Sequence, residues 1–439
     1  QRRCSRPRSR FAAAEPNPSG TFPSTRPTVG SADSVCPRRC CRSTGGAGPW
    51  DAPISGAIAS PRPRTGGALP RSRWPMAAVP TACRTTVSRG PSTCWASIPR
   101  AGSTTPAAWQ SNPMPRQNPH RPFTPDPEQL ALWPEVSGNA INGLGEGDPR
   151  RPSLVYWSPD PDAILHGPLQ RWFYTQSPDD PALAELRASR QSILERPLPE
   201  VATDRVERAP EDWTTALGRF VAEGACEMTG VAEMRDDWVF EGAEVTLPMI
   251  IMLGVQHDYD AIRTAPDVPA GTEVTRQYGR AASVAKDVAA WLRGEGWQAE
   301  ALTGPMAGSV TMIPPAIACG FGELGKHGSI INPELGASFR LCAVLTDAPF
   351  APTPPRDFGI DAFCMNCRIC EDACPPEAIF PDKKTVRGVE KWYVDFDRCL
   401  PFFNQTMGCA ICIAECPWSR PGVGLNLAAK LARRADRAS

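Results

Sequence analysis

The pattern of apolar and polar positions is most regular in the second half of the chain, where it predicts strands around a helix. An almost unbroken apolar run over 245–255, V-T-L-P-M-I-I-M-L-G-V, has the length of a buried strand. W-Q-A-E-A-L at 297–302 and F-R-L-C-A-V-L-T-D at 339–347 also read as strands. Between the first two, apolar residues recur at helical spacing and Gly294 marks a helix end. The helical positions are Ala281, Val284, Ala285, Val288, Trp291 and Leu292.

Strand, helix and strand in succession predict an α/β domain, or an α+β domain, over 240–350. Before it, Asp180 and Pro181 form a helix N-terminus signature, so 179–194 is predicted to be a helix. Residues 210–234 are predicted to form another helix. After it, a proline-rich linker leads into a cysteine-rich module. The predicted division is 1–115, 116–239, 240–350, 351–425 and a tail at 426–439.

Residues 1–115 show no sustained hydrophobic period and are rich in Arg, Pro, Ser, Gly, Ala and Thr. Such a segment buries too little apolar surface to offset its ordering entropy, so we expect disorder, or translated sequence upstream of the true start. Arg2 and Arg3 are not followed by the apolar stretch of an export signal. Six cysteines fall in this segment, at Cys4, Cys36, Cys40, Cys41, Cys83 and Cys94.

Charge is distributed unevenly along the chain. Residues 1–115 hold sixteen Arg, no Lys and three acidic residues, a net charge of +13, so the remainder carries −13 because the total is zero. An acidic body argues against nucleic acid as the main partner. No apolar run reaches about 18 residues, so no transmembrane segment is expected. We expect a cytoplasmic protein, or a membrane-associated periplasmic one if a twin-arginine leader has been lost.

Eight of the seventeen cysteines lie in two runs with the spacing of iron–sulfur ligands, C-x2-C-x2-C-x3-C-P and C-x9-C-x2-C-x3-C-P. In two-cluster ferredoxins the fourth cysteine of such a run ligates the other cluster. One [4Fe–4S] cluster is therefore predicted to bind Cys364, Cys367, Cys370 and Cys416. The other is predicted to bind Cys374, Cys399, Cys409 and Cys412. A structural zinc module, the alternative, does not account for two interleaved sets that each end in Cys-Pro.

The segment A-C-G-F-G-E-L-G-K-H-G-S-I-I-N-P-E-L-G-A-S-F-R-L-C-A-V-L-T-D at 318–347, followed by the linker and the cluster pair, resembles the corrinoid-dependent reductive dehalogenase family. The resemblance is to its catabolic, non-exported branch, and it covers 240–420. It implies a nitroreductase-like domain that binds base-off cobalamin, followed by a bacterial ferredoxin-like module with two [4Fe–4S] clusters. The activity it implies is that of an oxidoreductase which removes halide from a small organohalide.

The resemblance also implies roles for individual residues. Tyr278, in T-R-Q-Y-G-R, matches the tyrosine that supplies a proton, and Lys326 matches its basic partner, which stabilises the phenolate. Arg340 would be a second basic group or a contact to a cofactor phosphate, and Tyr259 is the rival proton donor. Glycines let the backbone approach a flat macrocycle closely. The predicted cofactor-binding residues are Gly320, Gly322, Gly325, His327, Gly328 and Ser329.

Two other functions stay open from the sequence. The related epoxyqueuosine reductases combine cobalamin with two clusters but act on a tRNA base; the acidic body and a C-terminus without helical repeats argue against that substrate. A plain electron-transfer protein would not need the additional α/β domain. For the favoured function we expect an external low-potential electron donor of the ferredoxin or flavodoxin type, because no fused reductase module follows the clusters.

Overall fold

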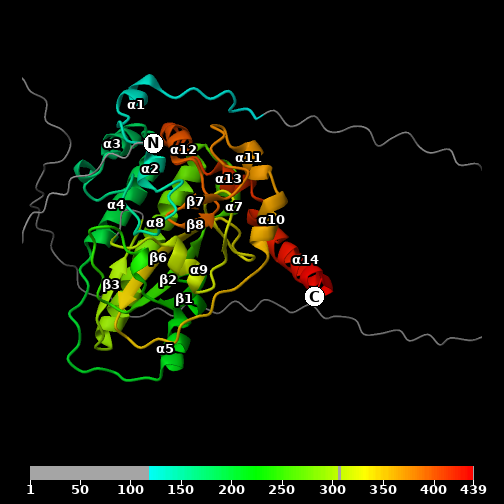
Figure 1. The fold of residues 1–439 in the computed structure, drawn as a ribbon. Helices are drawn as coiled ribbons and strands as arrows, with labels where there is room; N and C mark the ends of the chain where they lie inside the picture. The colour runs from blue at the N-terminus through cyan, green and yellow to red at the C-terminus, as the bar shows by residue number, and fades with distance from the viewer. Residues whose placement is uncertain (1–117, 305–307, 439) are drawn as a thin grey trace, which may run out of the picture. The chain divides into compact units, whose positions relative to one another are not determined.

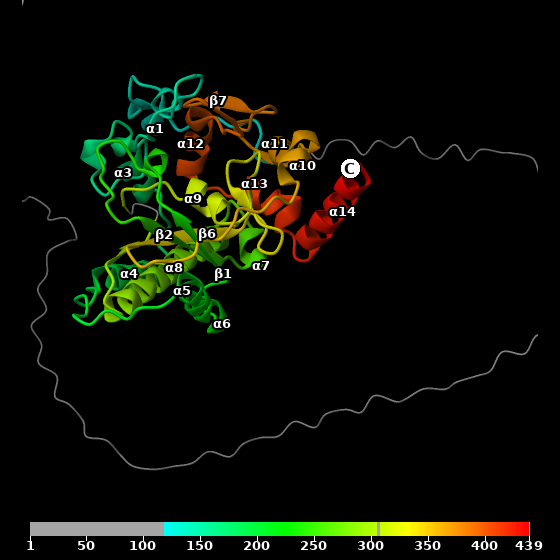
Figure 2. The same cartoon turned by 60° about the horizontal axis from the view of Figure 1, so that its bottom comes forward.

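The computed structural model describes residues 118–304 and 308–438 (Figures 1 and 2). The expectations for residues 1–115, including their six cysteines, lie outside the described residues. Among the residues that are described, no helix is both long and apolar enough to cross a lipid bilayer.

A four-stranded sheet forms the centre of the α+β region. Its order is β1-β2-β6-β3, and every pair of neighbours is antiparallel. Because β6 pairs with both β2 and β3, these two strands run in the same direction on either side of it. The strands are β1 (Met228–Glu233), β2 (Met249–Gln256), β3 (Ala299–Leu302) and β6 (Phe339–Thr346). The predicted mixed fold is confirmed, and the antiparallel pairing makes it α+β.

Both faces of this sheet are buried, which explains the unbroken apolar run in β2. On one face Ile251 and Leu253 pack with Val288 of α8 (Val268–Gly294), the long helix predicted from the apolar spacing. On the other face Ile250 and Met252 pack with residues around α9 (Ile313–Ala318). Successive strand residues point to opposite faces, so a strand covered on both sides needs apolar residues at nearly every position.

The region before β2 corrects one prediction. Residues 210–234 do not form a single helix: α5 (Pro210–Leu217) and the short α6 (Arg219–Ala222) are followed by β1. The chain leaves the helical conformation at Gly224, where φ is +74°. The apolar residues that follow Gly224 form β1, which pairs with β2, so tertiary contacts override the helical pattern of this segment.

The N-terminal helices connect the sheet domain with the cysteine module. Asp180 caps α4 as predicted, its side chain accepting from the backbone N–H groups of Ala182 and Leu183. Gln129 donates to the carbonyl of Pro401, and the Tyr156 hydroxyl donates to Asn404 at 2.6 Å; both acceptors lie on α12 (Phe396–Gln405). The helices are α1 (Pro127–Ala131), α2 (Gly138–Ile141), α3 (Gly167–Thr175) and α4 (Pro181–Glu195), with α7 (Tyr259–Ile262) preceding α8.

The cysteine module consists of short helices with a small two-stranded ribbon at its edge (Figure 2). Its helices are α10 (Ile360–Asn366), α11 (Ile369–Ala373), α12 (Phe396–Gln405) and α13 (Ile411–Glu415), and its ribbon is β7 (Lys384–Val386) with β8 (Val389–Lys391). The final helix, α14 (Val423–Ala438), contacts α10 through Leu431, which lies against Gly359.

The N-P-E-L-G turn at 332–336 joins the sheet domain to this module. The Asn332 carboxamide oxygen accepts from the backbone N–H groups of Glu334 and Leu335, and so holds the turn closed. Gly336 has a φ of +67°, and a Cβ there would lie 2.4 Å from the Cα of Ser419. Only glycine satisfies both the backbone conformation and the close approach.

We predict that Gly336→Ala separates the two parts of the structure. Left-handed backbone costs an alanine about 1–2 kcal/mol, and the overpacking against Ser419 adds about 1–3 kcal/mol. The matched control is Gly422→Ala, because Gly422 has a similar φ of +73° but open space around its Cβ position. Thermal unfolding and bound iron should show a larger loss for Gly336→Ala; equal losses would contradict the assigned contact.

Candidate functional site

Four cysteines from both runs surround one cavity. Cys364 lies on α10 and Cys370 on α11, and Cys416 follows α13 directly. Together with Cys367 they line the cavity, whose other walls include Lys326, His327, Phe363 and Trp418. This first set is the one that the crossed ligand pattern predicts, and it joins Cys416 to three thiols that lie 46 to 52 residues before it in the sequence.

The remaining four cysteines form a second set beside the first. Cys374, Cys399 and Cys412 pack together, and Cys399 interacts electrostatically with Cys409. Burial raises the pKa of Cys399 and of Cys409 to about 12, so these thiols hold their protons at neutral pH in the absence of a cation. Metal binding requires the thiolate and must therefore displace these protons.

The G-E-L-G-K-H-G turn at 322–328 contacts the cysteine module directly. The Glu323 carboxylate accepts from the backbone N–H groups of Phe358, Ile360 and Asp361, and so caps α10, which carries Cys364. A carboxylate at this helix terminus compensates the N–H groups that have no partner within the helix.

The glycines of this segment pack against the chain itself. A Cβ on Gly322 would lie 2.0 Å from the Ile331 carbonyl oxygen, and one on Gly325 would lie 2.6 Å from the Ile331 side chain. Gly320 and Gly328, at φ of +83° and +79°, face Pro354 and Val394. Internal packing therefore already requires glycine at these positions, and the expected approach of the backbone to a macrocycle stays a prediction.

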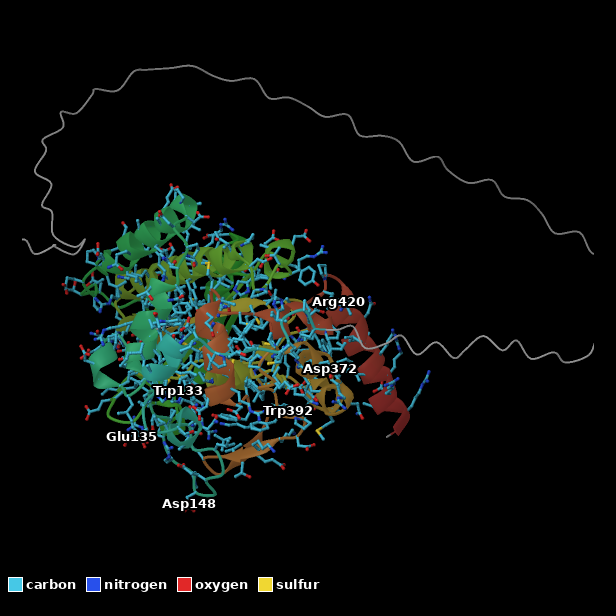
Figure 3. The ribbon with its side chains drawn as sticks, turned by 90° about the horizontal axis from the view of Figure 1, so that it is seen from above. Trp133, Glu135, Asp148, Asp372, Trp392 and Arg420 are labelled. Carbon is cyan, nitrogen blue, oxygen red and sulfur yellow. The ribbon has the colours of Figure 1, made fainter. Side chains whose placement is uncertain are left out.

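Lys326 is not the partner of Tyr278. Its side chain is 2% exposed, and its ammonium group lies 2.5 Å from a carboxylate oxygen of Glu371 on α11. The same group lies 5.0 Å from the ring centre of Trp392, which is labelled in Figure 3. The predicted role of Lys326 beside the phenol is corrected by this geometry, since the lysine serves the cysteine module instead.

His327 is buried in the same turn as a neutral ring. Burial lowers its pKa to about 4. Its Nδ1 accepts from the backbone N–H of Ser329 at 3.2 Å, and among the described residues its Nε2 has no partner. Ser329 also accepts, through its carbonyl oxygen, from the N–H of Gly325, which closes the turn.

Arg340 takes the place that was expected for Lys326. Its guanidinium donates to the Tyr278 hydroxyl oxygen at 3.1 Å and lies 4.8 Å from the centre of that ring. It also donates through Nε to His257 Nε2 at 3.0 Å. The second nitrogen of His257 lies 3.2 Å from the Ser338 hydroxyl. Burial and the neighbouring Arg340 hold the pKa of His257 well below its usual range, so the ring is neutral and accepts from Arg340.

His257 is the residue that sequence reasoning missed. The β2–β6 register places Val255 opposite Arg340, and the next inward position along β2 brings His257 to the same side. Arg190 completes the surroundings of the phenol, with its guanidinium 5.9 Å from the ring centre and its Nε buried without a partner among the described residues. The rival acid, Tyr259, begins α7 and its hydroxyl makes no hydrogen bond within the described part of the chain.

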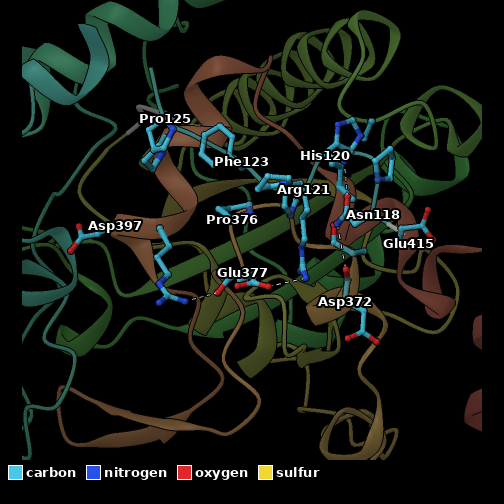
Figure 4. Close-up of a pocket in the computed structure, with 18 of the residues that line it drawn as sticks. Asn118, His120, Arg121, Phe123, Pro125, Asp372, Pro376, Glu377, Asp397 and Glu415 are labelled. Carbon is cyan, nitrogen blue, oxygen red and sulfur yellow. Dashed lines mark hydrogen bonds and ion pairs between the residues drawn. The ribbon is translucent and has the colours of Figure 1, made fainter. Parts of the chain in front are cut away.

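A large open cavity of about 2040 Å³ lies elsewhere, between the segment 118–125 and the cysteine module (Figure 4). Arg121 reaches across and donates to the carbonyl of Cys374 and to Glu377. Ile369 and Ile411, which neighbour cluster cysteines, line it, whereas Tyr278 and Arg340 do not. Its size alone does not make this cavity the reaction site, because the hydrogen bonds that join Tyr278, Arg340 and His257 lie outside it.

Comparisons with known proteins agree with this arrangement. Residues 363–419 match the family model of a 4Fe-4S dicluster domain. The chain is 34% identical over 217 residues to a tetrachloroethene reductive dehalogenase of Desulfitobacterium hafniense, a match covering 46% of this chain and 39% of that protein. This part of the chain is homologous to the reductive dehalogenases. The predicted family resemblance and the predicted two-cluster module are confirmed.

The likeness to solved structures extends further along the chain. A reductive dehalogenase structure superposes with a TM-score of 0.53 at 23% identity, covering 58% of this chain and 40% of that one, which shows a shared fold. An epoxyqueuosine reductase of Leadbetterella byssophila is 30% identical over 118 residues, 23% of this chain and 34% of that protein. The chain spans about two fifths of the length of the curated dehalogenase that it matches.

We predict that paired cysteine substitutions distinguish crossed from uncrossed ligation. If Cys364 and Cys416 share a cluster, the double variant Cys364→Ser/Cys416→Ser loses about half of the bound iron, because one cluster still has all four ligands. The pair Cys364→Ser/Cys374→Ser then loses nearly all of it. Iron content and EPR after anaerobic reconstitution are the measurements. The reverse pattern would show that each run binds its own cluster; Cys226→Ala, a buried cysteine outside both sets, is the control.

Proposed function

We propose that the chain catalyses reductive dehalogenation of a small organohalide, with cobalamin at the site and electrons delivered through the two [4Fe–4S] clusters. The observation that carries the proposal is the hydrogen bond from Arg340 to the Tyr278 oxygen. Since that oxygen accepts, the phenolic proton is not used in the pair and is available to a substrate. A protein that only carried electrons would need no such proton donor.

Support for cobalamin comes from two sources. The relative with the shared fold is a reductive dehalogenase whose structure concerns B12-dependent dehalogenation. In this chain, Arg190 Nε is a buried polar atom without a partner beside Tyr278 among the described residues, as expected where a further polar group binds. The 320–329 glycines do not fit as a cradle, because their Cβ positions are filled by the chain itself. Tyr278, Arg190 and Arg340 are therefore the residues that we assign to the cofactor and substrate side.

The reaction consumes two electrons and one proton. A carbon–halogen bond breaks, a carbon–hydrogen bond forms, and the halogen leaves as halide. Bound cobalamin would supply low-potential cobalt to this chemistry. Tyr278 gives its proton to the carbon, and Arg340 stabilises the phenolate that remains.

His257 contributes to this reaction by position. The neutral His257 ring accepts a hydrogen bond from Arg340 but carries no charge that would pair with the guanidinium. Its second ring nitrogen lies beside the Ser338 hydroxyl, which fixes the orientation of the ring. The electrons come from an external low-potential ferredoxin or flavodoxin and pass through the cysteine module.

Epoxyqueuosine reduction on tRNA is the second candidate, because one such reductase matches part of the chain. A tRNA gel shift with the reconstituted protein separates the two functions: binding at moderate salt would favour the tRNA reaction.

We also propose that the chain divides at the predicted boundaries into 116–239, 240–350 and 351–425. The helices of the first part contact both later parts, because Gln129 donates to Pro401 and Arg190 donates to Gly304.

We predict that Tyr278→Phe lowers halide release by about 10²–10⁴-fold, the usual contribution of a general acid. Tyr259→Phe makes the same chemical change at the rival tyrosine and should leave the rate within about twofold of the unchanged protein. The measurement is halide release from a panel of halophenols by the reconstituted full chain with a strong reductant. If Tyr259→Phe causes the large loss, the assigned proton donor is wrong.

A second comparison separates the two basic residues. Arg340→Gln should lower turnover by about 10²-fold with bound iron unchanged, because it removes a charge beside the developing phenolate. Lys326→Gln should instead lower stability, by at most about 3–5 kcal/mol, and reduce bound iron, because it leaves the buried Glu371 carboxylate with only the exposed Arg368, at 3.5 Å, as a charged partner. Unfolding curves, iron analysis and turnover on both variants are the measurements. Full iron content and stability in Lys326→Gln would argue against the structural role.

A further inference from the structure

We propose that His327 and Trp418 each donate an N–H hydrogen bond to sulfur of the [4Fe–4S] cluster held by Cys364, Cys367, Cys370 and Cys416, and that these bonds raise its reduction potential. The inference rests on cluster binding by the dicluster domain and not on the proposed dehalogenation. It reassigns His327 from the corrinoid to the cluster.

The donor on His327 follows from its hydrogen bonding. Nδ1 accepts from the backbone N–H of Ser329, so in the neutral ring the hydrogen lies on Nε2. That atom is buried and has no acceptor among the described residues. The backbone N–H of Ser329 thus fixes the orientation of the His327 ring, and Nε2–H is the donor that remains.

The donor on Trp418 needs no tautomer argument, because an indole nitrogen can only donate. Trp418 is 1% exposed and follows Cys416-Pro417 directly. Its ring packs edge-on against the Phe363 ring, with 5.5 Å between the two ring centres. Its Nε1 is also buried without an acceptor among the described residues. The indole of Trp392, in the same hydrophobic cluster, provides a contrast: its Nε1 donates to Asp361 at 2.8 Å.

Both residues that carry these unpartnered donors, His327 and Trp418, line the cavity of the first cysteine set. The third polar group of that wall, Lys326, is already paired with Glu371. Buried donors nearly always find an acceptor, and the acceptor that a bound cluster adds to this cavity is its bridging sulfide. A reduced cluster carries one more negative charge than an oxidised one, so N–H bonds to its sulfur stabilise the reduced form.

The test is an EPR-monitored redox titration of the reconstituted full chain. Trp418→Phe and His327→Phe should each make one of the two cluster potentials more negative, by about 59 mV for a tenfold change in a one-electron equilibrium. The other potential should not move. Trp392→Phe is the matched control, since it removes an indole N–H from the same core that is already bound to a carboxylate. Unchanged potentials in both test variants would overturn the proposal.

A second measurement does not depend on any variant holding its clusters. Protein with ¹⁵N-labelled tryptophan or histidine is reduced, and pulsed EPR detects nitrogen coupled to the cluster spin. We expect a coupling from each label in the unsubstituted chain, with the tryptophan coupling lost in Trp418→Phe and kept in Trp392→Phe. Absence of both couplings from the unsubstituted protein overturns the proposal, even if a substituted chain fails to fold.

Discussion

The buried ion pair between Lys326 and Glu371 fixes the position of the cysteine module relative to the sheet domain. Both side chains are largely removed from water, at 2% and 9% exposure, so the Lys326 charge is compensated by Glu371, which also pairs with the exposed Arg368 at 3.5 Å. The pair joins a turn that leads into the sheet to the helix that carries Cys370. Glu323 makes a second connection from the same turn by capping α10. Without these two contacts, the first cysteine set would lack its wall on the sheet side.

One short stretch of chain therefore serves two tasks. The turn at 322–328 organises the cysteine module, and β6, which follows within a dozen residues, presents Arg340 to Tyr278. Each basic residue has its own acidic or phenolic partner, and the two pairs do not compete. Residues 329–339, which include β5 (Ile330–Ile331) and the N-P-E-L-G turn, connect the two pairs, so Lys326 and Arg340 are positioned by one continuous stretch of backbone.

Periodic features of the sequence predicted the parts of the fold that depend on local pattern. The apolar run of β2, the spacing in α8 and the Asp180 cap were all visible, because burial and capping act over a few residues. The strand β1 was missed because its pairing with β2 is decided by distant residues. The partner of Lys326 lies 45 residues away, and its choice between a phenol and a carboxylate depends on how two domains meet. His257 was invisible for the same reason: only the strand register brings it to Arg340.

The depth at which the cysteines are buried has a consequence for how the protein is made. Burial raises the pKa of Cys370 and Cys416 to about 12, as it does for Cys399 and Cys409 in the second set. A chain that closed before receiving iron and sulfide would trap protonated thiols beneath Trp418 and Lys326. Loading the metal releases those protons, and the unfolded chain gives them up more readily than the folded one. Burial therefore makes insertion of iron and sulfide less costly while the module is still open than after it has closed.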